Sequence, residues 1–257
     1  MRTAERGDFG NLVSMTSVEG WGYREEDFGW FEKVGGRTLL AVEGREIIGM
    51  VTLFDYGDTG WISNLLVKCE ERRRGVGTAL LDECMRRFSE KRTIALFAYE
   101  HTVGFYEDHG FKRESDAHIA SLGAAQTEKW QAGRAMEVTE EMVEFDRECF
   151  GFTRPALLKG LSEIGEVLVP VKGRGFAIVR PDPIEPRAGP VVASDRKGGT
   201  ELLCSALSAA GPSAKALVTG EGFEALKYEG KISRLYQGDP PKIDRNRAFA
   251  FAGPELG

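Results

Sequence analysis

Residues 72–78, with the sequence RRRGVGT, combine groups that could bind a large anion. They follow an apolar, strand-like run that ends at Val67, and they open a helix-like pattern. The first turn of a helix has unpaired backbone N–H groups and a partial positive charge, and both stabilise an anion. Glycines at positions 75 and 77 let the backbone approach a ligand, and arginines add charge-assisted hydrogen bonds to phosphate oxygens. The segment therefore predicts a phosphate-binding loop, against the alternative of a solvated charge run at a helix start.

Three known kinds of phosphate loop can be compared with this segment. The P-loop needs a lysine before its Ser or Thr, whereas Gly77 is followed directly by Thr78. The dinucleotide fingerprint needs a third glycine where Leu80 stands, and the strands upstream look antiparallel. The pattern that remains is Arg-x-x-Gly-x-Gly, at Arg72, Gly75 and Gly77. Nucleic-acid binding is disfavoured, because two glutamates directly precede the arginines and no aromatic residues are interleaved with them.

The elements that must position this loop form an α+β pattern. A short strand or turn and a helix, with Asp8 as its N-cap, are expected over residues 2–15. Residues 38–67 contain three strand-like runs separated by glycine-containing turns, which is typical of an antiparallel meander. A helix is expected over residues 77–91, a buried strand over 92–99, a short helix over 102–110 ending at Gly110, and a strand over 111–122. One face of the 77–91 helix carries Leu80, Leu81, Cys84, Met85 and Phe88.

The second half of the chain repeats this order after a linker-like stretch at residues 123–133. Two helices are expected within 139–165, two strands within 175–194, a helix over 198–211, a strand over 215–220, a short helix over 222–231 and a final strand over 247–253. The sequence GTALL at 77–81 also matches GTELL at 199–203. We therefore expect two related domains, residues 1–124 and 134–257, each with a mixed, mostly antiparallel sheet flanked by helices.

Composition narrows the function classes. The chain has 257 residues, 34 basic and 40 acidic, so no overall charge draws it to nucleic acid or to a membrane. No apolar run approaches the ~20 residues of a membrane helix, and no signal peptide is visible. Four cysteines without a CxxC pair and three histidines without ligand companions predict neither disulfides nor a metal site. A cytoplasmic protein is expected.

Two further segments carry a resemblance to a known family. WISNLLV at 61–67 resembles the fourth strand of the GNAT superfamily of acyl-CoA transferases, and GFYEDHGFKRE at 104–114 resembles its recurring FYEKLGF segment. With the Arg-x-x-Gly-x-Gly loop, the resemblance covers about the first 120 residues. It implies the GNAT fold, acetyl-CoA as co-substrate, and N-acyl transfer to a primary amine by direct attack in a ternary complex. The second half resembles the C-terminal half of two-domain GNAT proteins.

The resemblance also implies roles for individual residues. The pyrophosphate loop would consist of Arg72, Arg73, Arg74, Gly75, Val76, Gly77 and Thr78. The stretch Leu65, Leu66 and Val67 would pair with the pantetheine arm and expose, at a bulge, the N–H that stabilises the oxyanion. Tyr106 would protonate the leaving thiolate, since a phenol with a pKa of about 10 is protonated at neutral pH. The alternative for Tyr106 is a packed aromatic ring. An asparagine frequent in the family is missing near Tyr99.

Other assignments stay open. The general base could be Glu100, Asp55, Asp58 or a relayed water, and an acyl-cysteine route through Cys69 is disfavoured because no base stands beside it in sequence. Trp21 and Trp61 either line an acceptor site or belong to the core. Whether the protein forms a homodimer is left open.

The second domain is expected to be silent. Its loop, SDRKGGTELL, is shorter and lacks the arginine cluster. When Gly110 is aligned with Gly230, Leu226 falls at the place of Tyr106. Its expected task is to cover the first domain's cleft and shape the acceptor pocket. We therefore expect an N-acetyltransferase for a small amine, and the alternative is a catalytically silent acyl-CoA-binding regulatory module.

Overall fold

The computed structural model describes residues 1–123, 130–182 and 185–257. The chain divides into two compact units, Met1–Ile94 and Ala95–Gly257. Unit 1 contains β1 (Arg2–Thr3), α1 (Phe9–Val18), α2 (Glu25–Lys33), β2 (Gly36–Glu43), β3 (Glu46–Tyr56), β4 (Thr59–Val67) and α3 (Val76–Arg87), and it ends within β5 (Thr93–Ala98).

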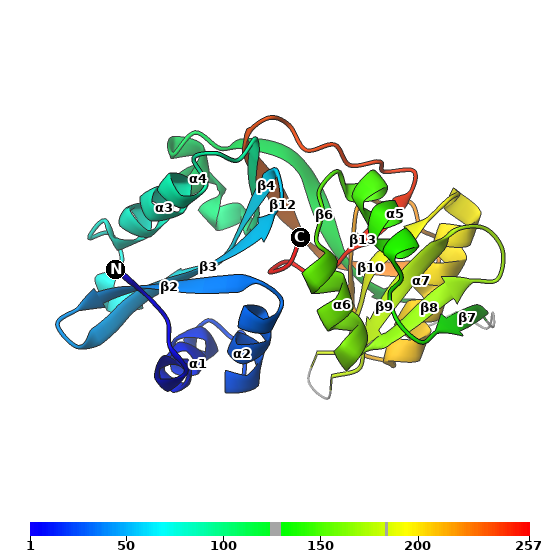
Figure 1. The fold of residues 1–257 in the computed structure, drawn as a ribbon, viewed down its shortest axis with the longest axis horizontal. Coiled ribbons are helices and arrows are strands. Elements are labelled where there is room, and N and C mark those ends of the chain that lie inside the picture. Colours follow the sequence, from blue (N-terminus) through cyan, green and yellow to red (C-terminus); the bar gives the residue numbers. More distant parts are fainter. Residues whose placement is uncertain (124–129, 183–184) are drawn as a thin grey trace. The chain divides into compact units, whose positions relative to one another are not determined.

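The sheet of unit 1 is the antiparallel run β1-β2-β3-β4, and helices cover both of its faces (Figure 1). Successive side chains of a strand point to opposite faces. A Cβ on Gly49 of β3 would lie 3.0 Å from Leu80 of α3, so Gly49 faces this helix. The Phe54 ring lies 6.0 Å from that of Phe31 in α2, so Phe54 faces α2. The meander predicted from the sequence is confirmed.

The helix predicted after the loop is α3, and its apolar face is buried as the sequence pattern indicated. Leu80, Leu81 and Cys84 have no exposed surface, Met85 is half-buried, and Phe88 follows as a buried C-cap. Burial raises the pKa of the Cys84 thiol to about 12. The first helix also begins after Asp8 as expected, although the Asp8 side chain accepts from the Glu5 N–H instead of capping that helix.

The sequence pattern did not predict α2, which is short. It begins after Arg24, whose N–H donates to Asp27 Oδ2 at 2.7 Å. Phe28 and Phe31 are buried, three residues apart on one face. Nine residues give too few turns for a clear helical period, and burial of these two rings decides the conformation.

Unit 2 contains the end of β5 and, after it, eight strands and four helices within the described residues. They are α4 (Val103–Asp108), β6 (Lys112–Leu122), β7 (Ala132–Ala135), α5 (Glu140–Phe150), α6 (Pro155–Ile164), β8 (Glu166–Pro170), β9 (Gly175–Arg180), β10 (Arg187–Ala193), α7 (Arg196–Ala210), β11 (Ala216–Val218), β12 (Leu226–Gly238) and β13 (Ala248–Phe251). Short 3-10 turns lie at Arg6–Asp8, Cys69–Glu71 and Glu100–Thr102. The strand order is β5-β12-β6-β11-β13-β10-β9-β8-β7.

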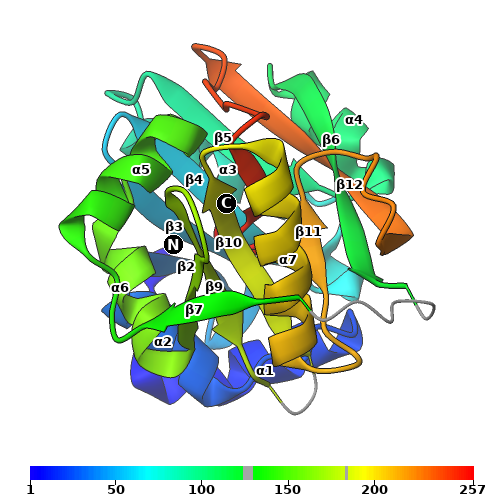
Figure 2. The same ribbon diagram turned by 90° about the vertical axis from the view of Figure 1, so that its right-hand side faces the viewer.

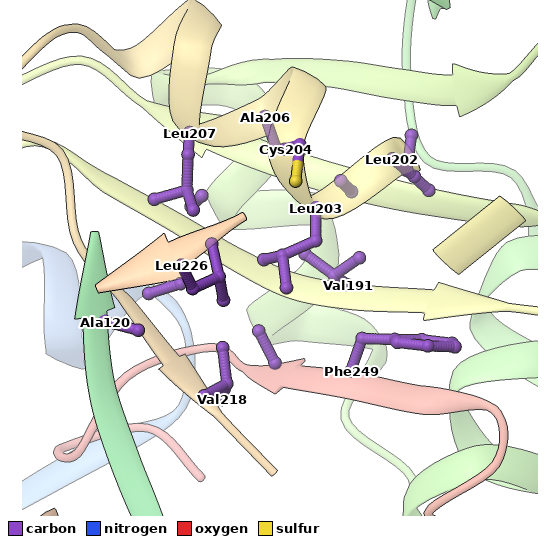
Figure 3. Packing of buried hydrophobic residues seen from close by; sticks show 14 of the residues in the cluster. Ala120, Val191, Leu202, Leu203, Cys204, Ala206, Leu207, Val218, Leu226 and Phe249 are labelled. Atoms are coloured by element: carbon purple, nitrogen blue, oxygen red, sulfur yellow. The ribbon is translucent and has the colours of Figure 1, made fainter. Parts of the chain in front are cut away.

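The core of unit 2 lies beneath α7, which packs along β9 and β10 (Figure 2). Leu203 and Leu207 of this helix pack in one cluster with Val191 of β10 and Phe249 of β13, all of them buried (Figure 3). Phe251, two residues further along β13, packs its ring 5.5 Å from that of Phe150 in α5. The helix expected over residues 198–211 is therefore confirmed as α7.

One expected helix is wrong. Residues 222–231 were expected to be helical, but β12 begins at Leu226 and pairs with β6 from Leu226 opposite Leu122 to Tyr236 opposite Lys112. The pairing supplies ladder hydrogen bonds and packing that outweigh the weak helical pattern of this short stretch. The alignment of Leu226 with Tyr106 consequently compares a strand residue with a helix residue.

The two halves of the chain repeat one order of elements. The series β1, α1, α2, β2, β3, β4, α3, β5 recurs as β7, α5, α6, β8, β9, β10, α7, β11. In each series the first four strands form an antiparallel run in chain order. The fold predicted from the sequence, a mostly antiparallel sheet flanked by helices and present twice, is confirmed. The structure does not test the domain bounds 1–124 and 134–257, which stay a prediction.

Candidate functional site

The predicted phosphate loop ends in an open helix N-terminus. Gly75 is the N-cap of α3 and has a φ of +81°, a left-handed conformation that glycine adopts without strain. The first helical bond runs from the Ala79 N–H to the Gly75 carbonyl at 2.9 Å. The N–H groups of Val76, Gly77 and Thr78 precede this bond and have no acceptor within the helix. No acidic residue lies in this first turn, so its partial positive charge is available to an anion.

The three arginines of the loop differ in their surroundings. Arg72 Nε donates to the Val67 carbonyl at 3.0 Å and its guanidinium pairs with Glu19, so it ties the end of β4 to the loop. Arg74 pairs with Glu71, and with Glu43 at 3.4 Å. Arg73 is exposed, has a φ of +63°, and makes no ion pair with any residue that the structure describes. Arg73 is therefore the loop arginine whose charge is not offset by a carboxylate.

A β-bulge lies in β4 at the start of the predicted pantetheine stretch. Thr52 of β3 is opposite Ser63, and Met50 is opposite Leu66, so Asn64 and Leu65 together oppose a single residue. Asn64 has a φ of +51°. A bulge of this kind bends the strand and turns backbone groups away from the ladder.

A cavity of about 470 Å³ lies within unit 1 beside the residues that connect the bulge to the loop. Its walls come from α1, the β2–β3 turn, the end of β4 and the following 3-10 turn. They are formed by Asn11, Ser14, Met15, Val18, Glu19, Arg45, Glu46, Ile47, Leu66, Val67, Lys68, Cys69 and Glu70. Two residues of the predicted pantetheine stretch therefore line it. The exposed Cys69 also lines it, with Sγ 3.9 Å from Glu19 Oε1.

Tyr106 lies in unit 2, on α4, where its ring is buried. It packs against Phe105 and Phe111, with ring centroids 5.1 and 5.8 Å away. The helix ends at Asp108 with His109 as its C-cap, and Gly110 follows with a φ of +85°, as its predicted C′ position requires. These contacts are those of a packed aromatic, and its role as general acid stays a prediction.

The carboxylates considered as general base are exposed. Glu100 pairs with Arg113 at 2.8 Å, and Asp55 pairs with Lys91 at 2.6 Å. Asp58 lies in the turn between β3 and β4. All three are exposed, so their positions single out no base.

The tryptophans considered for the acceptor site differ in burial. Trp61 is fully buried, whereas Trp21 is half-buried, with its ring 6.2 Å from that of Tyr23. Trp61 therefore belongs to the core of unit 1.

The corresponding places in the second repeat are altered. In β10, Gly189 and Pro190 together oppose Ile178, so the bulge is present, but Pro190 stands where Leu65 stands in β4 and has no N–H. Asp195 is the N-cap of α7, and its Oδ1 accepts from the Gly198 N–H at 2.9 Å. The chain's own carboxylate therefore fills the position at which α3 could bind an anion. Sequence reasoning missed both residues, although an Asp three residues before the first helical glycines is a cap signal.

Within residues 1–123, 130–182 and 185–257, no group of three His, Cys, Asp or Glu side chains is arranged to hold a metal ion. None of the helices described there is both long enough and apolar enough to cross a bilayer.

Comparisons with known proteins agree with this geometry. The sequence model of the Acetyltransferase (GNAT) family matches residues 10–111, and that of the Acetyltransferase (GNAT) domain matches residues 142–218. A search of curated proteins finds no match.

Solved structures share the fold. A candidate acetyltransferase from Pyrococcus horikoshii is similar over 100% of this chain and 95% of its own, with a TM-score of 0.87 and 20% identity. A GCN5-related N-acetyltransferase from Anabaena variabilis covers 91% of this chain and 71% of its own, with a TM-score of 0.60 and 11% identity. Because the two family models together span more than half of the sequence, the chain belongs to the GNAT acetyltransferase family and carries two GNAT domains in tandem.

Proposed function

We propose that this protein transfers an acetyl group from acetyl-CoA to the primary amine of a small molecule. The observation that carries the proposal is the start of α3, where three N–H groups lack helical acceptors and the adjacent Arg73 has no carboxylate partner among the described residues. A diphosphate offers several anionic oxygens to such a cradle, and the open helix end favours their charge. Membership of the GNAT family supports acyl transfer as the reaction class.

In this proposal unit 1 holds the acyl donor along two elements. The amides of Val76, Gly77 and Thr78, with Arg73, bind the diphosphate, while Arg72 and Arg74 hold the loop through their ion pairs. Leu65, Leu66 and Val67 lie along the pantetheine arm, and the cavity beside Leu66 and Val67 provides room next to them.

The transfer itself needs few side chains. The amine nitrogen forms a bond to the thioester carbonyl carbon, and the resulting oxyanion accepts a hydrogen bond from a β4 N–H at the bulge. Collapse of this intermediate breaks the C–S bond, and Tyr106 donates a proton to the thiolate. The proton lost by the amine passes to water or to a carboxylate.

We also propose that the chain has domains at 1–124 and 134–257 and that the second domain does not bind acetyl-CoA. Pro190 lacks the bulge N–H that the reaction needs, and Asp195 would repel a diphosphate at the start of α7. Both features disfavour binding of acetyl-CoA, the ligand that we propose for the start of α3.

The test is release of free thiol from acetyl-CoA, measured across a library of primary amines. The proposal expects amine-dependent release for at least one class and a loss of that release in Tyr106→Phe. Binding of acetyl-CoA without release for any amine would favour the catalytically silent regulatory module instead.

A further inference from the structure

One side-chain hydrogen bond connects the bulge of β4 with the segment between α1 and α2. The Tyr23 hydroxyl donates to Asn64 Oδ1 at 3.0 Å. Tyr23 precedes α2, whereas Asn64 is the first of the two residues that form the bulge. The contact therefore joins residues 41 positions apart at the point where β4 leaves its regular ladder.

The side chain of Asn64 needs an explanation beyond the backbone conformation. A left-handed φ of +51° is available to glycine at no steric cost, and asparagine accepts it less freely. In the second repeat, the first bulge position is indeed a glycine, Gly189. A bulge can therefore form at this position without an amide side chain, yet unit 1 has one at Asn64.

Tyr23 is a rigid anchor for this amide. Its ring lies 5.7 Å from Phe28 and 5.6 Å from Phe31, both edge-on, and Phe31 in turn packs against Phe54 of β3. The Asn64 Nδ2 atom is buried and makes no hydrogen bond with any residue that the structure describes. The Tyr23 hydroxyl is therefore the contact that fixes the orientation of the amide.

We propose that Tyr23 and Asn64 are a positioning pair that sets the orientation of the β4 bulge. The pair thereby orients the backbone N–H that donates a hydrogen bond to the acyl oxygen. This inference rests on the proposed function. The better a hydrogen-bond donor is aligned with the developing oxyanion, the more it stabilises the transition state. Complete removal of such a donor lowers the rate by a factor of about 10²–10³. Misalignment of the donor should cost less, about tenfold.

The experiment compares Tyr23→Phe, Asn64→Gly and the double variant with the wild type. Glycine preserves the left-handed backbone while removing the amide, so it isolates the side chain. Tyr56→Phe, at the far end of β3, controls for loss of a buried hydroxyl. We expect kcat to fall about tenfold in each single variant and by no more than about a further twofold in the double variant, because both changes break one contact.

A second readout does not depend on turnover. Coenzyme A lacks the acyl oxygen, so calorimetry should show unchanged affinity for coenzyme A, within about twofold, but a reduced preference for acetyl-CoA in the variants. Equal kcat and equal preference in Tyr23→Phe and the wild type would overturn the inference, even if Asn64→Gly does not fold. Parallel losses of both affinities would also overturn it, since they indicate a general structural effect. Failure of the wild type to bind either ligand would refute the proposed function instead.

Discussion

Replacement of Arg73 by alanine should weaken acetyl-CoA binding more than the same replacement of Arg74. Arg74 is paired with Glu71 and Glu43, so removing it also releases two carboxylates from their partner. Arg73 makes no ion pair within the described residues, and its charge is available to a diphosphate. Alanine occupies the left-handed region no more easily than arginine does. Strain in the backbone of residue 73 is therefore the same in the wild type and in Arg73→Ala, and a difference in affinity comes from the side chain.

The size of the expected increase in Kd follows from the exposure of Arg73. A hydrogen bond to a charged group is worth about 1.5–3 kcal/mol, but solvent screening at an exposed site reduces this to about 1 kcal/mol. Since 1.4 kcal/mol corresponds to a factor of ten, Kd for acetyl-CoA should rise about fivefold in Arg73→Ala. The partners of Arg74 already offset its charge, so Arg74→Ala should change Kd by about twofold or less.

Calorimetry at low and high salt is the appropriate assay. At 0.15 M salt, charges interact over about 8 Å, and at 1 M over about 3 Å, so the difference between the two variants should shrink as salt is added. Equal effects of the two substitutions, or a larger effect of Arg74→Ala, would refute the assignment of Arg73 as the phosphate-facing arginine.

Three other predictions concern stability and reactivity. Asp146→Asn should lower the free energy of unfolding by about 3–5 kcal/mol in urea, because Arg154 is fully buried and pairs with both oxygens of Asp146 at 2.9 and 3.0 Å. Gly199→Ala should cost about 1–3 kcal/mol in thermal unfolding, because its Cβ would lie 2.1 Å from the Phe249 ring. Iodoacetamide at pH 8 should label Cys69 first, and saturating acetyl-CoA should slow that labelling because Cys69 lines the cavity beside the loop.

Each of these predictions has a control within the chain. Glu144→Gln breaks an exposed ion pair with Arg147 and should lower the free energy of unfolding far less than Asp146→Asn does. Gly198→Ala places its Cβ 3.5 Å or more from its neighbours and should be tolerated. Burial raises the pKa of Cys149 to about 12, so it should stay unlabelled in the folded protein. Equal effects in the test and control variants, or labelling of Cys149 before Cys69, would contradict the packing described.

The sequence predicted the helix start at Gly75 better than it predicted some of the other elements. Glycines at 75 and 77 after an apolar strand have few structural uses other than a tight helix start, and α3 begins there. The stretch 222–231 lacked such a constraint, and its pairing with β6, more than 100 residues earlier, decided its conformation. A local pattern cannot show a strand partner that far away in the chain.

The partners of individual side chains could not be predicted from the sequence for the same reason. Three consecutive arginines look equivalent in a sequence, but Glu19 and Glu43 come from separate elements and leave Arg73 distinct. The pair of Tyr23 and Asn64 likewise depends on the packing of α2 against β3. The one signal for it was an asparagine within a strand pattern, where this residue is uncommon.

The most direct test of the account is calorimetric titration of acetyl-CoA into the wild type and two double variants. Arg72→Ala with Gly75→Ala alters the start of α3, while Lys197→Ala with Gly198→Ala alters the corresponding start of α7. We predict that the first pair of substitutions abolishes binding and that the second leaves Kd within about twofold of the wild-type value. Absence of heat with the wild type, or equal losses in the two double variants, would contradict it.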